Sequence, residues 1–64
     1  MTLEEIAWTY AELRMRCAED RRLGKPNARR IKNRNMLAQV LANAGWLVGH
    51  DSVSNEYGDV IVTF

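Results

Sequence analysis

The only proline of the chain, Pro26, stands two residues after Gly24 and limits how far any helix can continue. Proline lacks a backbone N–H and fixes its φ angle, whereas glycine readily takes the left-handed conformation that ends a helix. The segment Gly24-Lys25-Pro26-Asn27 therefore predicts the end of one helix and the start of another. The expected arrangement is an antiparallel or crossing pair of helices joined by a short loop.

Capping signals set the expected bounds of both helices. Thr2-Leu3-Glu4-Glu5 is a capping box, so the first helix is predicted over about residues 2–23. The second helix is predicted over about residues 28–44, with Asn27 or Lys25 as its N-cap and Gly45 as its terminating residue.

The pattern changes after Gly45 to short runs of β-branched and aromatic residues. Such runs favour strands, and the Asp, Ser, Asn and Gly residues between them favour turns. We expect a C-terminal β-hairpin with strands over about 46–53 and 59–64. The predicted fold class is therefore α+β, with two helices followed by a hairpin in a single domain over residues 1–64.

The first helix has two apolar stripes. The stripe predicted to face the core consists of Leu3, Ile6, Tyr10, Leu13 and Cys17. The second stripe lies beside it and consists of Trp8, Ala11, Met15 and Ala18. Either the hairpin or a second copy of the chain is expected to cover it. We interpret Trp8, Ala11 and Met15 as an interface to another subunit or to a partner protein.

The small size of the chain favours self-association. A chain of 64 residues hides only about 60% of its unfolded surface on folding. Its single cysteine, Cys17, can form no intrachain disulfide and cannot build a zinc site alone. Cys17 falls on the core-facing stripe, so we interpret it as a buried apolar residue and not as a nucleophile. A homodimer is expected.

Charge is strongly segregated along the chain, although the net charge is only +1. All nine Lys and Arg residues lie between Arg14 and Arg34, with only Glu19 and Asp20 among them, so this segment carries a net charge of +7. The residues before it and after it each carry a net charge of −3. A block of this density attracts phosphate backbones or acidic protein surfaces, or it forms a solvated basic surface that maintains solubility.

The second helix combines an apolar side with a polar stripe. The residues predicted to point inward are Ile31, Leu37, Ala38, Val40, Leu41 and Ala44. The polar stripe consists of Lys32, Asn35, Gln39 and Asn43. Lys and Arg bind phosphate oxygens, while Asn, Gln and Arg also bind base edges. The alternative interpretation is that these amides only form a hydrated surface.

These features predict a small DNA-binding regulator or accessory protein whose partner is duplex DNA. The residues expected to contact phosphates surround the interhelical loop and are Arg21, Arg22, Lys25, Arg29 and Arg30. Arg34 flanks the polar stripe and is also expected to bind nucleic acid. Lys32, Asn35 and Gln39 are expected to approach base edges. The alternative function is a protein-binding module, such as an inhibitor or adaptor, that docks an acidic or apolar partner surface. RNA binding is a weaker third alternative, because few aromatic residues are available for stacking on bases.

Residues 28–64 resemble the outline of a winged-helix DNA-binding domain, with a basic helix followed by a hairpin that closes on Val60-Ile61-Val62-Thr63-Phe64. The resemblance implies that the helix lies in the major groove and that the hairpin contacts the backbone or minor groove. The sequence departs from that family because one helix, and not two, precedes the basic helix.

Several other functions find no support in the sequence. The four glycines do not form a phosphate-binding loop, and the Asp residues near His50 are interpreted as turn residues and not as metal ligands. We therefore expect no enzyme activity, no cofactor and no metal site. Glu4 and Glu5 stand where a signal peptide carries basic residues, and the longest apolar run, Ala44 to Gly49, is too short for a membrane span. A cytoplasmic protein is expected.

Overall fold

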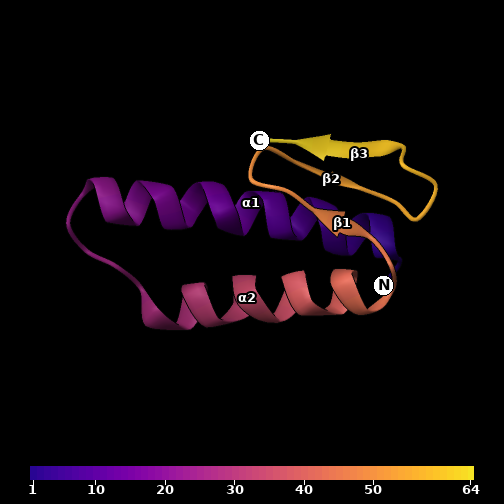
Figure 1. The fold of residues 1–64 in the computed structure, drawn as a ribbon. Coiled ribbons are helices and arrows are strands. Elements are labelled where there is room, and N and C mark those ends of the chain that lie inside the picture. Colours follow the sequence, from indigo (N-terminus) through magenta and orange to yellow (C-terminus); the bar gives the residue numbers. More distant parts are fainter.

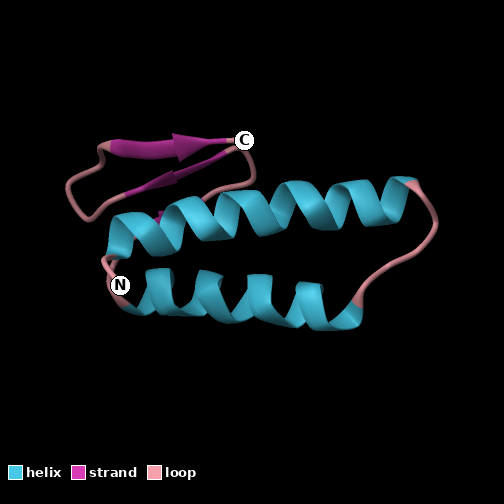
Figure 2. Ribbon diagram, turned by 180° about the vertical axis from the view of Figure 1, so that it is seen from behind, coloured by secondary structure: helices cyan, strands magenta, loops and turns pink.

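Two helices lie side by side in opposite directions, and a small antiparallel sheet covers one end of the pair (Figures 1 and 2). The computed structural model describes residues 1–64. Helix α1 spans Leu3–Arg22 and helix α2 spans Ala28–Asn43. Strands β1 (Leu47–Val48), β2 (Ser52–Ser54) and β3 (Val60–Thr63) follow in that order in the sheet. The α+β class is confirmed.

Local capping fixes the ends of both helices, as predicted from the sequence. The backbone N–H of Glu5 donates to the hydroxyl of Thr2, and the backbone N–H of Arg30 donates to the side-chain oxygen of Asn27. At the other ends, Gly24 and Gly45 have φ angles of 71° and 84°. The N–H groups of the glycines and of the residues after them bond back to the last helical turn, which is the Schellman arrangement.

The prediction of a two-stranded hairpin was incomplete, because the sheet has three strands. The stretch predicted as one strand over 46–53 turns at residues 49–51, where the N–H of Gly49 donates to the carbonyl of Ser52 at 2.9 Å. Strand β1 then pairs antiparallel with β2, matching Leu47 with Ser54 and Val48 with Val53. Strand β3 pairs with the other edge of β2, and this places Val53 in the middle strand, where it is fully buried.

The core lies where the sheet covers the helix pair. Its five buried members are Ala7, Tyr10, Leu41, Trp46 and Val53. Strand β3 packs on α1 and strand β1 packs on α2, so each layer contributes to one cluster. Ring centroids of Tyr10 and Phe64 are 5.8 Å apart in an edge-to-face arrangement, which links the middle of α1 to the end of the chain. Only seven of the 64 residues are buried, so the core is small.

The predicted core stripe of α1 is confirmed, but two residues of α2 were assigned wrongly. Tyr10 and Cys17 are buried, and Leu3, Ile6 and Leu13 are half-buried. Val40 and Ala44, predicted to point inward, are exposed. Val40 lies at the flank of the side that carries the buried Leu41, and Ala44 is the C-cap residue after the end of α2.

Candidate nucleic-acid interface

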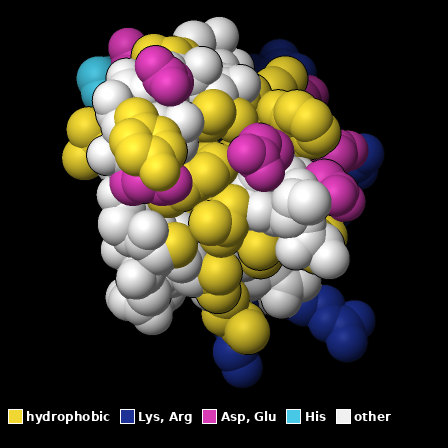
Figure 3. Space-filling view, turned by 90° about the vertical axis from the view of Figure 1, so that its right-hand side faces the viewer, with side chains coloured by type: hydrophobic (Ala, Val, Ile, Leu, Met, Phe, Trp, Pro, Cys, Tyr) yellow, Lys and Arg dark blue, Asp and Glu magenta, His cyan; other side chains and the backbone are white.

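The positive charge gathers at the end of the molecule that carries the interhelical loop. This loop and the sheet lie at opposite ends of the helix pair (Figure 1), and the molecule as a whole extends for 37 Å along its longest axis. Figure 3 looks at the opposite end, where hydrophobic side chains and uncharged atoms cover most of the surface, several acidic side chains lie among them, and basic side chains appear only at the margins. Charge segregation along the sequence has therefore become segregation along the molecule.

Three of the basic residues are neutralised by carboxylates of α1. Arg16 pairs with Glu12 and Arg22 pairs with Glu19, both within one helical turn and both exposed. Arg30 differs, because its guanidinium bonds Asp20 at 2.6 Å across the two helices, with only 29% and 18% of the two side chains exposed. The Arg30–Asp20 pair holds the loop ends of α1 and α2 together. Arg30 is therefore occupied by a structural contact.

Four cations at the loop end stay without a partner. The side chains of four exposed residues make no hydrogen bond or ion pair within the chain: Arg21, Lys25, Arg29 and Lys32. They come from the last turn of α1, the loop and the first turns of α2. Long flexible cations of this kind neutralise phosphates without reading sequence. The four residues are named here the free cations, because their charges are exposed and not compensated within the chain.

The polar stripe predicted on α2 is exposed along its whole length. Gln39 donates to the side-chain oxygen of Asn43 at 2.8 Å, and Arg34 donates to the side-chain oxygen of Asn35 at 3.1 and 3.2 Å. Both amides at positions 35 and 39 keep further donors or acceptors for an outside ligand. Because only the opposite side of α2 packs on α1, this stripe is sterically free to approach a groove of DNA.

Two large apolar side chains of α2 are exposed: Met36, which was not assigned to a side from the sequence, and Val40, which was placed inward. Met36 and Val40 are 56% and 44% exposed, and they lie four residues apart, on one line of the helix. Apolar side chains beside amides are suited to the methyl group of thymine. In helical projection Met36 lies beside Lys32 and Gln39 of the polar stripe, and this position was the signal available in the sequence.

The partner interface predicted on α1 is only partly exposed. Trp8 and Met15 are 55% and 63% exposed, so the sheet does not cover them. Ala11 is 5% exposed, and the prediction that it faces a partner was wrong. Its short side chain lies one turn beyond the fully buried Ala7, on the same side of the helix.

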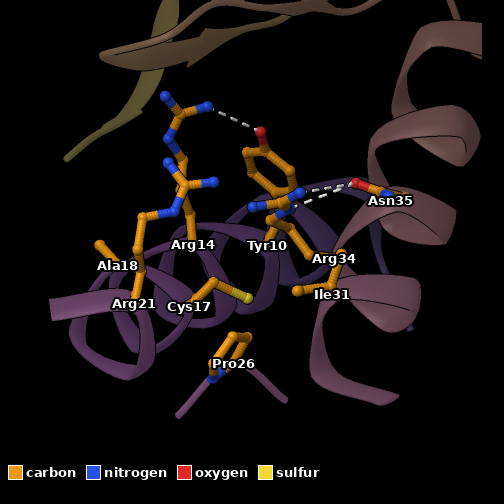
Figure 4. A pocket seen from close by; sticks show the side chains of 9 residues that line it. All are labelled: Tyr10, Arg14, Cys17, Ala18, Arg21, Pro26, Ile31, Arg34 and Asn35. Atoms are coloured by element: carbon orange, nitrogen blue, oxygen red, sulfur yellow. Dashed lines mark hydrogen bonds between the residues drawn. The ribbon is translucent and has the colours of Figure 1, made fainter. Parts of the chain in front are cut away.

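A cleft between the two helices adds an element that the sequence did not reveal. It has a volume of about 530 Å³, and its polar lining comes from Tyr10, Arg14, Arg21, Arg34 and Asn35 (Figure 4). The Nη1 of Arg14 donates to the hydroxyl of Tyr10 at 3.1 Å, and the guanidinium lies 4.7 Å from the centre of the Phe64 ring. Arg14 occupies a core-facing position four residues after Tyr10, and a cation at such a position was the signal available in the sequence.

Comparisons with models of protein families, with curated proteins and with solved structures find no match to this chain. Neither helix is long and apolar enough to cross a membrane. No group of three or more His, Cys, Asp or Glu side chains is placed to hold a metal ion. The interpretation of function therefore depends on the surface chemistry of this chain alone.

Proposed function

We propose that the protein binds duplex DNA through its loop end and the outer side of α2, as a small regulator or accessory factor. The observation that carries this proposal is the set of free cations beside an exposed row of amides on one helix. Cations supply affinity that does not depend on sequence, and amides on a helix supply hydrogen bonds to base edges. The 16 residues of α2 extend for about 24 Å, which is long enough to follow the major groove.

The residues divide into two groups by their contacts. Arg21, Lys25 and Arg29 surround the loop and are assigned to phosphates. Lys32, Asn35 and Gln39 continue along α2 and are assigned to base edges. Arg22 adds a phosphate contact by leaving Glu19, because an exposed ion pair within one helix contributes only about 0.3–0.5 kcal/mol.

Three parts of the sequence-based hypothesis are not included in the proposed interface. Arg34 is half-buried, donates to the side-chain oxygen of Asn35 and lines the cleft between the helices. Arg30 is held by Asp20 between the helices. The turn between β2 and β3 lies at the end of the molecule opposite the loop and carries Glu56 and Asp59, so it would repel the same DNA backbone (Figure 1). The sheet therefore contributes to this function by supporting α2 and not as a wing.

Fluorescence anisotropy of a labelled random duplex, measured over a salt series, tests the proposal. We expect binding at about 50 mM salt and a logarithmic salt slope of about −4, because each neutralised phosphate contributes about −0.9. Absence of binding at this low salt concentration rejects DNA as the ligand. The protein-binding alternative, which is favoured by the exposure of Trp8 and Met15, would then take its place.

We also propose that the chain forms a homodimer through the Trp8–Met15 side of α1. These two large side chains are exposed on the side turned away from α2, while the core that stabilises the monomer is small. Trp8→Glu is expected to convert the dimer to a 7.4 kDa monomer in sedimentation equilibrium, because a charge in an apolar interface is not solvated.

Met36→Glu is the matched control for the dimer, since Met36 is exposed to the same extent on the other helix. This variant should keep the oligomeric state of the wild-type protein. A wild-type protein that sediments as a monomer at micromolar or higher concentration would reject the dimer.

A further inference from the structure

The cleft between the helices has a positive lining without any compensating carboxylate. Arg14 and Arg21 extend into it from α1 and Arg34 from α2, while no Asp or Glu lines it (Figure 4). The acidic residues nearest to the cleft residues in sequence are already paired: Glu12 with Arg16, Glu19 with Arg22, and Asp20 with Arg30. We propose that this cleft is a binding site for a phosphate group, carried by a small organic phosphate or by a nucleic-acid backbone.

The burial of the arginines supports a bound anion. The side chains of Arg14 and Arg34 are half-buried, yet neither has an anionic partner within the chain. A cation that has lost part of its hydration and lies near like charges is unfavourable without a counter-ion. An anion in the cleft would remove this cost for several arginines at once.

Two of the guanidinium groups are already held in place. Arg14 is fixed by the hydroxyl of Tyr10 and the ring of Phe64, and Arg34 is fixed by the side-chain oxygen of Asn35. Each guanidinium has five N–H donors, so most donors remain free for a ligand. Binding therefore requires little further ordering of these side chains, which favours affinity.

The number of arginines favours phosphate over carboxylate as the anion. One arginine satisfies a carboxylate with two parallel hydrogen bonds, and the carboxylate carries a single charge. A phosphate monoester carries a charge of about −1.5 to −2 and three strong acceptor oxygens, which matches three guanidinium groups. The volume of about 530 Å³ exceeds the size of one phosphate, so an organic group has room beside Pro26 and Ile31.

This site does not rest on the proposed DNA function. Arg14 and Tyr10 belong to the cleft and not to the outer side of α2, and the sheet closes over them through Phe64. Three cleft residues, Arg21, Arg34 and Asn35, are among the residues assigned to DNA contacts or adjacent to them in the sequence. Experiments must therefore distinguish a small organic phosphate from a nucleic-acid backbone as the source of the phosphate group.

Titration of isotopically labelled protein with inorganic phosphate and with phenyl phosphate, followed by ¹⁵N–¹H NMR at constant ionic strength, tests the site. We expect saturable shifts at the side-chain N–H groups of Arg14 and Arg34. Arg14→Gln should weaken the apparent affinity about tenfold or more, because a charged hydrogen bond is lost. Arg16→Gln is the matched control, since Arg16 is on the same helix, outside the cleft, and should leave the affinity unchanged.

A second variant tests the site if Arg14→Gln does not fold. The exposed side chain of Arg21 lines the cleft without a hydrogen bond or ion pair within the chain, so Arg21→Gln should fold normally and still weaken phosphate binding. Arg16→Gln is again the control, because Arg16 lies outside the cleft. The proposal is overturned by shifts that do not saturate, by equal affinity in wild-type protein and both cleft variants, or by acetate binding as tightly as phosphate.

A short duplex without terminal phosphates identifies the source. If the backbone supplies the phosphate, the duplex displaces phenyl phosphate and Arg14→Gln weakens binding of the duplex. If a small phosphate is the ligand, the duplex leaves the Arg14 shift unchanged. Both results support the cleft as a phosphate-binding site. A duplex that does not bind at all rejects only the proposed DNA function.

Discussion

The double variant Lys25→Ala, Arg29→Ala is expected to lower the affinity for every DNA duplex by about a hundredfold. Both cations are exposed and unpaired at the loop end, so each is available for one phosphate contact. Loss of a charged contact costs on the order of tenfold, and two independent contacts combine. The logarithmic salt slope should fall in magnitude by about 2, since each lost phosphate contact contributes about 0.9. Anisotropy over a salt series measures both quantities.

Two control experiments distinguish phosphate contacts, which do not depend on the DNA sequence, from base contacts, which recognise it. Arg16→Ala removes a cation whose charge Glu12 already compensates, and it should leave the affinity nearly unchanged. Asn35→Ala or Gln39→Ala should leave the salt slope unchanged but reduce the preference between sites by about 1–3 kcal/mol. An equal loss in the double variant and in Arg16→Ala would mean that only the total charge matters, and it would contradict the assignment of the loop end.

Leu41→Ala is expected to unfold most of the protein at room temperature. Leu41 is fully buried on α2 and packs in the cluster that joins α1, α2 and the sheet. Truncation of a buried leucine costs about 2–5 kcal/mol, and a core of this size rarely supplies more than about 3–5 kcal/mol. Far-ultraviolet circular dichroism measures the loss of helix, and a urea titration measures the loss in the free energy of unfolding.

Val40→Ala is the matched control for the core. It removes part of an apolar side chain from the adjacent position, but Val40 is 44% exposed on the outer side of the helix. Its effect on the free energy of unfolding should remain within about 0.5 kcal/mol. A larger loss from Val40→Ala than from Leu41→Ala would show that α2 packs on its other side.

The helix ends were determined by the sequence itself. Thr2, Gly24, Asn27 and Gly45 act through contacts within a few residues, and the predicted bounds agree with the structure to within one residue at each end. Local signals suffice here because a cap satisfies backbone groups of its own helix. The division into two helices and a β-rich end, and the basic block at the loop, could for the same reason be inferred without a structure.

The remaining features depend on contacts between segments far apart in the chain. The turn at Gly49 becomes visible only when β2 pairs with a strand on each side, and this pairing makes the sheet three-stranded. The periodicity of α2 was ambiguous for Val40, and the position of α1 settled it.

The electrostatic surface was also decided by tertiary structure. Asp20 withdraws Arg30 from the basic surface across ten residues of sequence, and the cleft forms only because α1 and α2 lie side by side. The sequence gives the number and order of the charged residues, whereas the fold determines which of them lie close enough to neutralise one another. Which charges neutralise one another depends on the distances between side chains of different elements. The periodicity of residues within one helix gives no information on those distances.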